Sequence, residues 1–240
     1  MTTRDKRAEL LALARKRQAT RWSGYTCVGD YHDGVDECDF VSLYSKTAGN
    51  VDARILVMLQ DWSSDSSLSG PFDEDSATFG HTRNLPTNRN LIRLLKATFD
   101  VNLEDVYGTN LFPFIKPGSM SNSILRKDLV RAAHEFALPQ IRIVGPRLVI
   151  CLGLVTFNAL RQTCALTRSS NLSSAIGSPF DLDSVRTWCQ AHTGVLGKNT
   201  RNRGGVDRVS QDWQNMRADL AARALQENAV DRKPPGQAQA

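Results

Sequence analysis

The sequence predicts an α/β protein with a three-layer α/β/α arrangement around a central, mostly parallel four-stranded sheet. Three observations predict this class: short continuous apolar runs, segments of helical periodicity between them, and polar residues directly after the runs. Continuous apolar runs are typical of strands that are buried on both faces of a parallel sheet. Strands that alternate with helices build such sheets. Ligands then bind beyond the carboxyl ends of the strands.

The composition indicates one globular domain with a mild preference for anionic partners. The chain has 240 residues, of which 41% are hydrophobic, so it can bury a sizeable core. Its net charge of +5 favours a partner such as nucleic acid, although many other proteins carry a similar excess. Five scattered cysteines without a CxxC pattern indicate reduced thiols and a cytoplasmic location. No apolar run approaches membrane-spanning length, so no membrane partner is expected.

The first elements lie in the N-terminal quarter. Residues 4–21 alternate charges with leucines, which predicts a short basic helix that makes residues 1–22 a separate N-terminal unit. This helix either packs on the domain or touches phosphates, and a solvated outer face is the simpler interpretation. A weak strand is expected at 40–44, and the first firm strand covers 54–59.

A long loop separates the first firm strand from the next helix. Residues 62–87 are rich in Ser, Asp and Gly, and a connection of this length in a compact domain is often functional. Helical spacing follows at 88–99, and a second strand covers 106–111. Residues 125–144 are helical, with an interruption near Pro139, which starts a second segment.

The remaining elements complete the sheet. A third buried strand covers 147–152, a helix covers 155–161, and a fourth strand covers 185–191. The last helix is expected at 209–227. The catalytic domain would then span 23–229, followed by a polar, Pro-containing and disordered tail at 230–240.

Polar side chains follow three of these strands. Gln60 and Asp61 end the first strand, Asn110 ends the second, and His192 follows the fourth. A carboxylate at this place can position a water molecule or stabilise a developing positive charge. Each residue also has a purely structural interpretation as a turn cap or a loop hydrogen-bonding group. Because three strand ends would deliver Asp, Asn and His to one edge of the sheet, we expect a site there.

In these segments the chain resembles the uracil-DNA glycosylase superfamily, over roughly residues 50–215. The family motif Gln-Asp-Pro-Tyr corresponds to Gln60-Asp61-Trp62-Ser63, and the family strand that ends in Asn corresponds to residues 108–111. A strand of the form Pro-x-x-apolar-Leu-Gly corresponds to residues 146–153. The motif His-Pro-Ser-Pro-Leu corresponds to His192-Thr193-Gly194-Val195-Leu196.

The resemblance implies roles for five residues in excision of a flipped base. Asp61 would position the attacking water and stabilise the sugar cation, and His192 would donate toward the base O2. Gln60 would supply a backbone contact near the base carbonyl, Phe79 would stack on the base, and Asn110 would read its Watson–Crick edge. These residue types suit the reaction, because breaking an N-glycosidic bond creates a cationic sugar and an anionic base.

Contacts with DNA are expected after the histidine. By resemblance, Leu196 would fill the gap that the extruded nucleotide leaves. The segment 198–205 is basic and contains glycines, so Lys198, Arg201 and Arg203 are predicted to contact phosphates, with a solvated surface loop as the alternative.

The chain departs from the family pattern at Ser63, where the related enzymes carry a tyrosine that excludes 5-substituted pyrimidines. A small side chain there predicts a pocket for a 5-substituted base, namely hydroxymethylated or glucosylated cytosine, unless Trp62 refills the space. Asn110 does not separate uracil from cytosine, because an amide can donate or accept. No cysteine follows the Asn strand closely, so no iron–sulfur cluster, metal or other cofactor is expected. No lysine stands at the motif positions, which favours a monofunctional enzyme.

The sequence therefore predicts a monomeric, monofunctional DNA glycosylase that removes a modified pyrimidine, in a defence role against viruses with modified DNA. Two alternatives remain: a uracil-DNA glycosylase of base-excision repair, and a non-catalytic DNA-binding module on the same fold. An unrelated doubly wound hydrolase or nucleotide-binding protein is disfavoured, since the chain lacks GxGxxG and GxxxxGK[ST] motifs.

Overall fold

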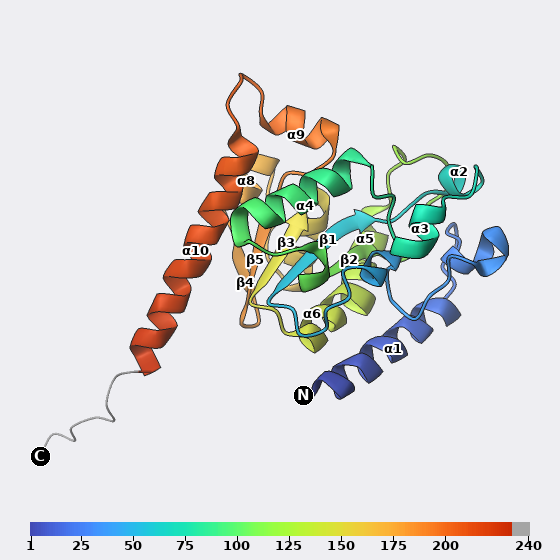
Figure 1. Cartoon of the computed structure of the whole chain (residues 1–240), viewed down its shortest axis with the longest axis horizontal. Helices are drawn as coiled ribbons and strands as arrows, with labels where there is room; N and C mark the ends of the chain where they lie inside the picture. The colour runs from blue at the N-terminus through green and yellow to red at the C-terminus, as the bar shows by residue number, and fades with distance from the viewer. Residues whose placement is uncertain (232–240) are drawn as a thin grey trace, which may run out of the picture.

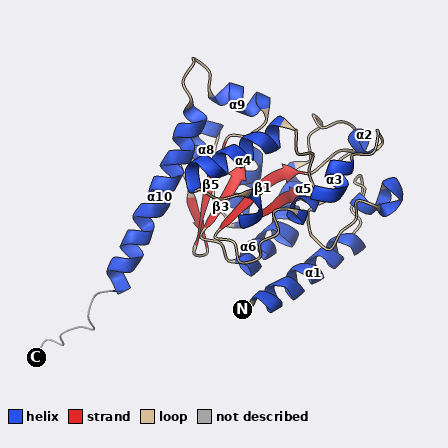
Figure 2. Cartoon of the chain, viewed as in Figure 1, coloured by secondary structure: helices blue, strands red, loops and turns tan. Residues whose placement is uncertain are grey.

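The fold is built around one five-stranded sheet (Figures 1 and 2). The computed structural model describes residues 1–231. In spatial order the sheet runs β2-β1-β3-β5-β4. The strands are β1 (Ile55–Asp61), β2 (Tyr107–Phe112), β3 (Leu148–Leu152), β4 (Phe180–Leu182) and β5 (Val185–Gln190). The neighbours β2-β1, β1-β3 and β3-β5 are all parallel, which confirms the α/β class and the mostly parallel sheet.

The expected number of four strands is wrong, because a short fifth strand joins the sheet at its edge. β4 pairs antiparallel with β5, and the hairpin between them places Asp183 in the left-handed region at φ 53°. With only three residues, and an exposed Asp181 between two buried ones, β4 has neither the length nor the apolar run that marks the other strands. The four predicted firm strands each lie within one or two residues of the observed ones.

Helices pack around this sheet. They are α1 (Thr3–Ala19), α2 (Asp65–Leu68), α3 (Glu74–Phe79), α4 (Pro86–Phe99), α5 (Arg126–Ala132), α6 (Leu138–Val144), α7 (Leu154–Thr163), α8 (Leu172–Ile176), α9 (Val195–Arg201) and α10 (Arg208–Asp231). α7 packs against β1, β3 and β5, whereas α10 packs against α4 and β5. Figure 1 shows α4 crossing in front of the sheet and α10 extending along its side. Because helices cover the sheet, β2 and β3 are buried along their whole length.

α1 belongs to the main core and is not a separate unit. Leu10, Leu13, Ala14 and Arg17 are buried, and this spacing of three and four residues forms one stripe along the helix. The three apolar side chains join the same hydrophobic cluster as the central strands. The fully buried Arg17 guanidinium pairs with Glu37 and also donates to backbone carbonyls of the following loop. The helix therefore packs on the domain with its remaining face exposed, and contact of that face with phosphates stays a prediction.

Several connections are more ordered than the sequence predicts. The weak strand at 40–44 is absent. A 3₁₀ turn, Leu43–Lys46, stands there instead, and the Ser42 hydroxyl caps it. The long loop at 62–87 contains α2 and α3, and residues 198–201 of the predicted basic loop lie in α9. These helices have four to seven residues, too few for a clear periodic pattern.

The helix around Pro139 is interrupted as expected. A π-helical turn, Ala133–Ala137, joins α5 to α6, and the proline stands in the first turn of α6, where a missing N–H is tolerated. At the C-terminus, α10 continues to Asp231, so the predicted tail at 230–240 begins within a helix. The rest of that prediction lies outside the described residues.

Two global expectations can be compared with the structure. All five cysteines are free, as predicted. Within residues 1–231, no helix is both long enough and apolar enough to cross a membrane.

Candidate active site

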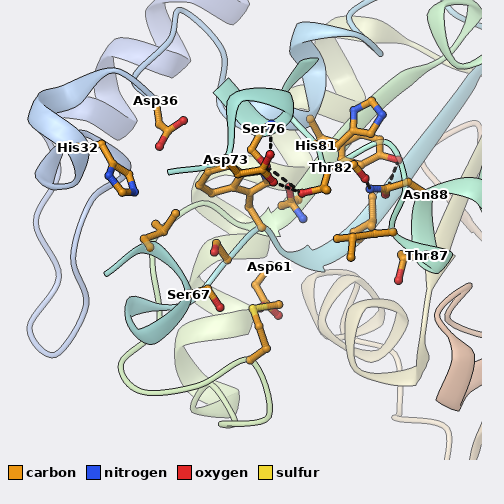
Figure 3. Close-up of a pocket in the computed structure, with 18 of the residues that line it drawn as sticks. His32, Asp36, Asp61, Ser67, Asp73, Ser76, His81, Thr82, Thr87 and Asn88 are labelled. Carbon is orange, nitrogen blue, oxygen red and sulfur yellow. Dashed lines mark hydrogen bonds between the residues drawn. The ribbon is translucent and has the colours of Figure 1, made fainter. Parts of the chain in front are cut away.

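Three strand-end side chains meet at one cavity. Asp61 ends β1, Asn110 lies in β2 two residues before its end, and His192 follows β5 by two residues. All three line a cavity of about 290 Å³, together with the buried Ser63. Figure 3 shows Asp61 in this cavity. In the parallel register Asn110 lies opposite Leu59, which precedes Asp61 by two residues in β1. The expected convergence at the carboxyl edge is confirmed for these residues.

The Asp61 carboxylate is held by a hydrogen bond at one oxygen and by an ion pair at the other. Gln60 Nε2 donates to Oδ1 over 2.7 Å, and Lys116 Nζ lies 2.8 Å from Oδ2. The Asp61 and Lys116 side chains are only 6% and 3% exposed. Lys116 Nζ also donates to the Met120 carbonyl over 2.7 Å. The carboxylate is therefore oriented, and it has the opposite charge that a buried anion needs.

Lys116 is the main site residue that the sequence analysis missed. It lies four residues after β2, where an isolated β-bridge pairs it with Ser64, directly beside the β1 turn. A lysine at the end of the apolar run 111–115 was the available signal, since lysine is almost never buried without a partner. Gln60, in contrast, does not line the cavity. Its side chain orients Asp61 instead of reaching toward a ligand.

Asn110 is oriented by a residue outside the predicted motifs. It is 1% exposed, and its Oδ1 accepts a hydrogen bond from the Ser42 hydroxyl over 2.5 Å. The Ser42 oxygen in turn accepts from the Tyr44 backbone N–H, which directs the hydroxyl proton toward Asn110. Within the described chain, Asn110 Nδ2 has no such partner. In this arrangement, Asn110 offers a donor to the cavity.

His192 is oriented as a donor as well. The Gly194 N–H donates to Nδ1 over 3.1 Å, so in the neutral ring the proton is on Nε2. His192 is an exposed residue. The protein around the ring removes part of its hydration and lowers the pKa of His192, an effect that the negative charge of Asp61 opposes. The neutral form is therefore favoured at pH 7.

The turn that carries His192 is anchored to the start of α4. Thr193 Oγ1 donates to the Thr87 carbonyl over 2.9 Å, and Asn90 Nδ2 donates to the Thr193 carbonyl over 2.8 Å. At Gly197 a Cβ atom would lie 2.3 Å from the His192 carbonyl oxygen, so only glycine permits this close approach. The turn is thus rigid although it lies at the surface.

Phe79 does not reach the cavity. The Arg83 guanidinium covers its ring at 4.2 Å from the centroid. Tyr44 and His81 line the cavity instead, and their rings lie 5.1 Å apart. Tyr44 fits there because β2 has Gly108 beneath it, where a Cβ atom would lie 2.7 Å from the tyrosine ring.

The sequence predicts space for a 5-substituent beside Ser63. In the structure, Trp62 and Ser63 both line the cavity. The Trp62 indole N–H donates to the Gly80 carbonyl over 2.9 Å. Gly80 ends α3 in the left-handed region at φ 75°, and a Cβ atom there would lie 1.8 Å from the Leu43 carbonyl oxygen. The indole is therefore fixed as one side of the cavity, and the buried Ser63 remains beside it.

The predicted DNA-contacting residues divide into two groups. Leu196, in the first turn of α9, is 82% exposed, the largest exposed fraction of any large apolar side chain within residues 1–226. Lys198 is partly exposed and Arg203 is exposed. Arg201 is instead occupied, since it makes a bidentate pair with the buried Asp212 at 2.6 and 2.9 Å and donates to Ser173. Its main role is structural.

The part of the chain that the structure describes contains no group of three or more His, Cys, Asp or Glu side chains arranged to hold a metal ion. A scan against protein-family models and a search of curated proteins find no match for this chain.

Proposed function

We propose that this chain is a monofunctional DNA glycosylase, built as a three-layer α/β/α domain, that flips a pyrimidine out of DNA and hydrolyses its N-glycosidic bond. The observation that carries the proposal is the convergence of Asp61, Asn110 and His192, from three strand ends, on one cavity large enough for a base. An extruded base needs such a pocket, because its glycosidic bond cannot be reached within the duplex.

The contacts of these residues support a division of roles. The oriented Asp61 carboxylate suits the cationic sugar and an attacking water molecule. His192 Nε2–H suits the base oxygen on which negative charge grows. Asn110 Nδ2 suits an acceptor on the Watson–Crick edge, either O4 of uracil or N3 of cytosine.

Lys116 does not change the monofunctional proposal, although it lies beside Asp61. A lyase step requires a neutral amine that is free to attack the sugar. Lys116 Nζ is instead buried and occupied by contacts with one carboxylate and one carbonyl, so it is not free to attack. Borohydride trapping of a covalent enzyme–DNA product would contradict this assignment.

For the substrate, we propose a hydroxymethylated or glucosylated cytosine, with DNA as the only partner and no cofactor. The support is Ser63, which leaves the wall beside Trp62 without a second large ring. A cytoplasmic, monomeric enzyme of this specificity would act in defence against viruses with modified DNA. Uracil repair and DNA binding without turnover remain the alternatives, and the next experiment separates them.

The test is a panel of duplex oligonucleotides that each carry one test base: uracil, thymine opposite guanine, 5-hydroxymethylcytosine or glucosylated 5-hydroxymethylcytosine. Abasic product is detected by alkaline cleavage. Asp61→Asn and His192→Gln should each lower excision by about 100-fold or more. The controls Asp100→Asn and His134→Gln change exposed residues away from the cavity and should leave excision unchanged.

Each outcome selects one function. Excision of the modified cytosines supports the proposal, and excision of uracil alone supports the repair enzyme. If the wild-type protein binds these duplexes but releases no base, the binding module is the correct description.

A further inference from the structure

We infer that the end of the cavity around Asp36 is a subsite for a hydroxyl-bearing, glycosyl-type substituent on C5 of the flipped pyrimidine. This inference rests on the proposed function and names the feature that would recognise the modification. Figure 3 shows Asp36 and His32 on one side of the cavity and His81 and Asn88 on the other, with Asp61 between them. A base beside Asp61 could therefore extend a substituent toward Asp36.

Asp36 is the central residue of this subsite, because it is a buried carboxylate with an oxygen that has no hydrogen-bond partner among the described residues. It is 2% exposed and lines the cavity, yet its Oδ1 has no hydrogen-bond partner among the described residues. A buried polar atom without a partner costs about 1–3 kcal/mol, so native proteins rarely keep one without a reason. A ligand hydroxyl would supply the missing donor.

The loop around Asp36 is held in an unusual conformation. His32 and Asp33 both adopt the left-handed region, at φ 48° and 53°, which is uncommon for residues other than glycine. The His32 ring contacts Phe72 edge to face, with centroids 5.2 Å apart. The buried Arg17–Glu37 pair holds the residue that follows Asp36. Asp36 and His32 are thus presented to the cavity by a fixed loop.

The second carboxylate in this region is already satisfied. Asp73 Oδ1 accepts from backbone N–H groups at the start of α3, and Oδ2 accepts from Ser76 over 2.9 Å and from Thr82. Asp73 therefore orders the wall, whereas Asp36 Oδ1 is enclosed beside the cavity and lacks a hydrogen-bond donor among the described residues. One free carboxylate does not provide the several oxygen ligands that a hard cation requires.

The surroundings of Asp36 favour a neutral polyhydroxyl group. The carboxylates of Asp36 and Asp73 both line this part of the cavity and would repel an anionic ligand. Burial raises the pKa of Asp36, an effect that His32 and Lys46 oppose. Trp62, Leu68 and Pro71 line the same cavity and offer an apolar surface to the C–H face of a sugar ring. The cavity volume of about 290 Å³ is near the lower limit of about 300 Å³ for pockets that enclose drug-sized ligands.

The test compares two duplexes that differ only in the glycosyl group: 5-hydroxymethylcytosine and its glucosylated form. Under single-turnover conditions, Asp36→Asn should slow excision of the glucosylated base by about tenfold or more, the effect of losing one hydrogen bond to a charged group. Excision of plain hydroxymethylcytosine should change less than about twofold. Asp33→Asn is the matched control, because it alters an exposed carboxylate of the same loop that does not line the cavity.

A second variant and a binding measurement separate this inference from the proposed function. Ser67→Ala removes an exposed hydroxyl on the cavity wall, and it should also weaken only the glucosylated substrate. Because this hydroxyl lies 3.0 Å from that of the buried Ser64, thermal unfolding checks that the variant keeps the wild-type stability. In an Asp61→Asn background, fluorescence anisotropy should show tighter binding of the glucosylated duplex, and Asp36→Asn should remove this preference.

The outcomes are distinct. If hydroxymethylcytosine is excised normally and the Asp36 and Ser67 variants treat both duplexes alike, the subsite is overturned while the glycosylase stands. If no base is released but Asp36 still determines the binding preference, the subsite stands while the glycosylase proposal fails. Equal binding of both duplexes by wild-type and variant proteins overturns the subsite whatever the turnover.

Discussion

At the scale of single residues, the site is determined by how its charged and polar groups are paired. Asp61 has a buried lysine on one oxygen and an amide on the other, while His192 receives a backbone N–H. Each contact orients a side chain that lines the cavity. The properties of Asp61 and His192 therefore depend on their contacts with Lys116, Gln60 and Gly194.

We expect His192 to titrate below its ordinary pKa of about 6.5, because loss of hydration disfavours the charged ring. The unfolded chain then binds this proton more readily than the folded protein, so the stability from neutral His192 is lost as the pH falls from about 6.5 through the lowered pKa. Asp61→Asn removes the negative charge that opposes the shift and should lower the pKa of His192 further. Ring-proton NMR titration measures both values. A higher pKa in the variant would contradict the Asp61–His192 coupling.

Lys116→Met should destabilise the protein by about 3–5 kcal/mol, because it leaves the Asp61 carboxylate buried without its counter-charge. Adding Asp61→Leu should recover most of this loss, since the buried charge is then gone as well. Urea unfolding gives the three free energies. The matched control is Lys96→Met, which breaks an exposed pair with Asp100 and should leave stability unchanged. If Lys116→Met and Lys96→Met lower the free energy of unfolding equally, the buried Lys116–Asp61 pair does not stabilise the protein more than the exposed pair.

At the scale of elements, the site depends on the short segments that connect the strands. α3 ends at Gly80, which positions Trp62, and the His192 turn is bound to the start of α4. The first turn of α9 then presents an exposed leucine, Leu196, four residues after His192. These elements are short, but each orients one wall or edge of the site.

Leu196→Ala should lower excision from duplex DNA by about tenfold, and it should leave excision from a single strand unchanged. The reason is that a wedge only helps where a base must leave a stack, which costs a few kcal/mol in duplex DNA. The measurement is single-turnover excision of the same test base in both contexts. Leu225→Ala changes another exposed leucine, on α10, and serves as the control. Equal losses on both substrates would assign Leu196 to the pocket instead of to base flipping.

At the scale of the whole molecule, segments far apart in the sequence enclose one cavity. The wall with Asp36 comes from the first 40 residues, the carboxylate from β1, and the histidine from the end of β5. The N-terminal helix contributes buried side chains to the same core as the sheet. The cavity is therefore a property of the complete domain.

Removing residues 1–19 should strongly destabilise the domain. Leu10 and Leu13 are buried in the main core, and each is worth about 1.5–3 kcal/mol of burial. The double variant Arg4→Ala/Arg7→Ala alters only exposed charges of the same helix and should retain the wild-type melting temperature. Thermal unfolding of both proteins is the measurement. An unchanged melting temperature after the deletion, with weaker DNA binding, would support the phosphate-contact alternative for this helix.

The sequence by itself determined the α/β class, the four parallel strands and the three polar residues at their ends. These are encoded locally, because continuous apolar runs mark buried strands and the carboxyl ends of parallel strands share one edge. Short elements such as β4, α3 and α9 escaped prediction, since three to seven residues carry too little periodicity. Only the tertiary structure decided that Lys116 pairs with Asp61, that Ser42 orients Asn110, and that Tyr44 and His81 line the cavity while Phe79 does not. It also placed the unpartnered Asp36 on the cavity wall. The paired residues in these contacts are 25 or more positions apart in the sequence, and the place of Asp36 also depends on long-range packing. A local sequence pattern does not show which distant side chains the folded core will bring together.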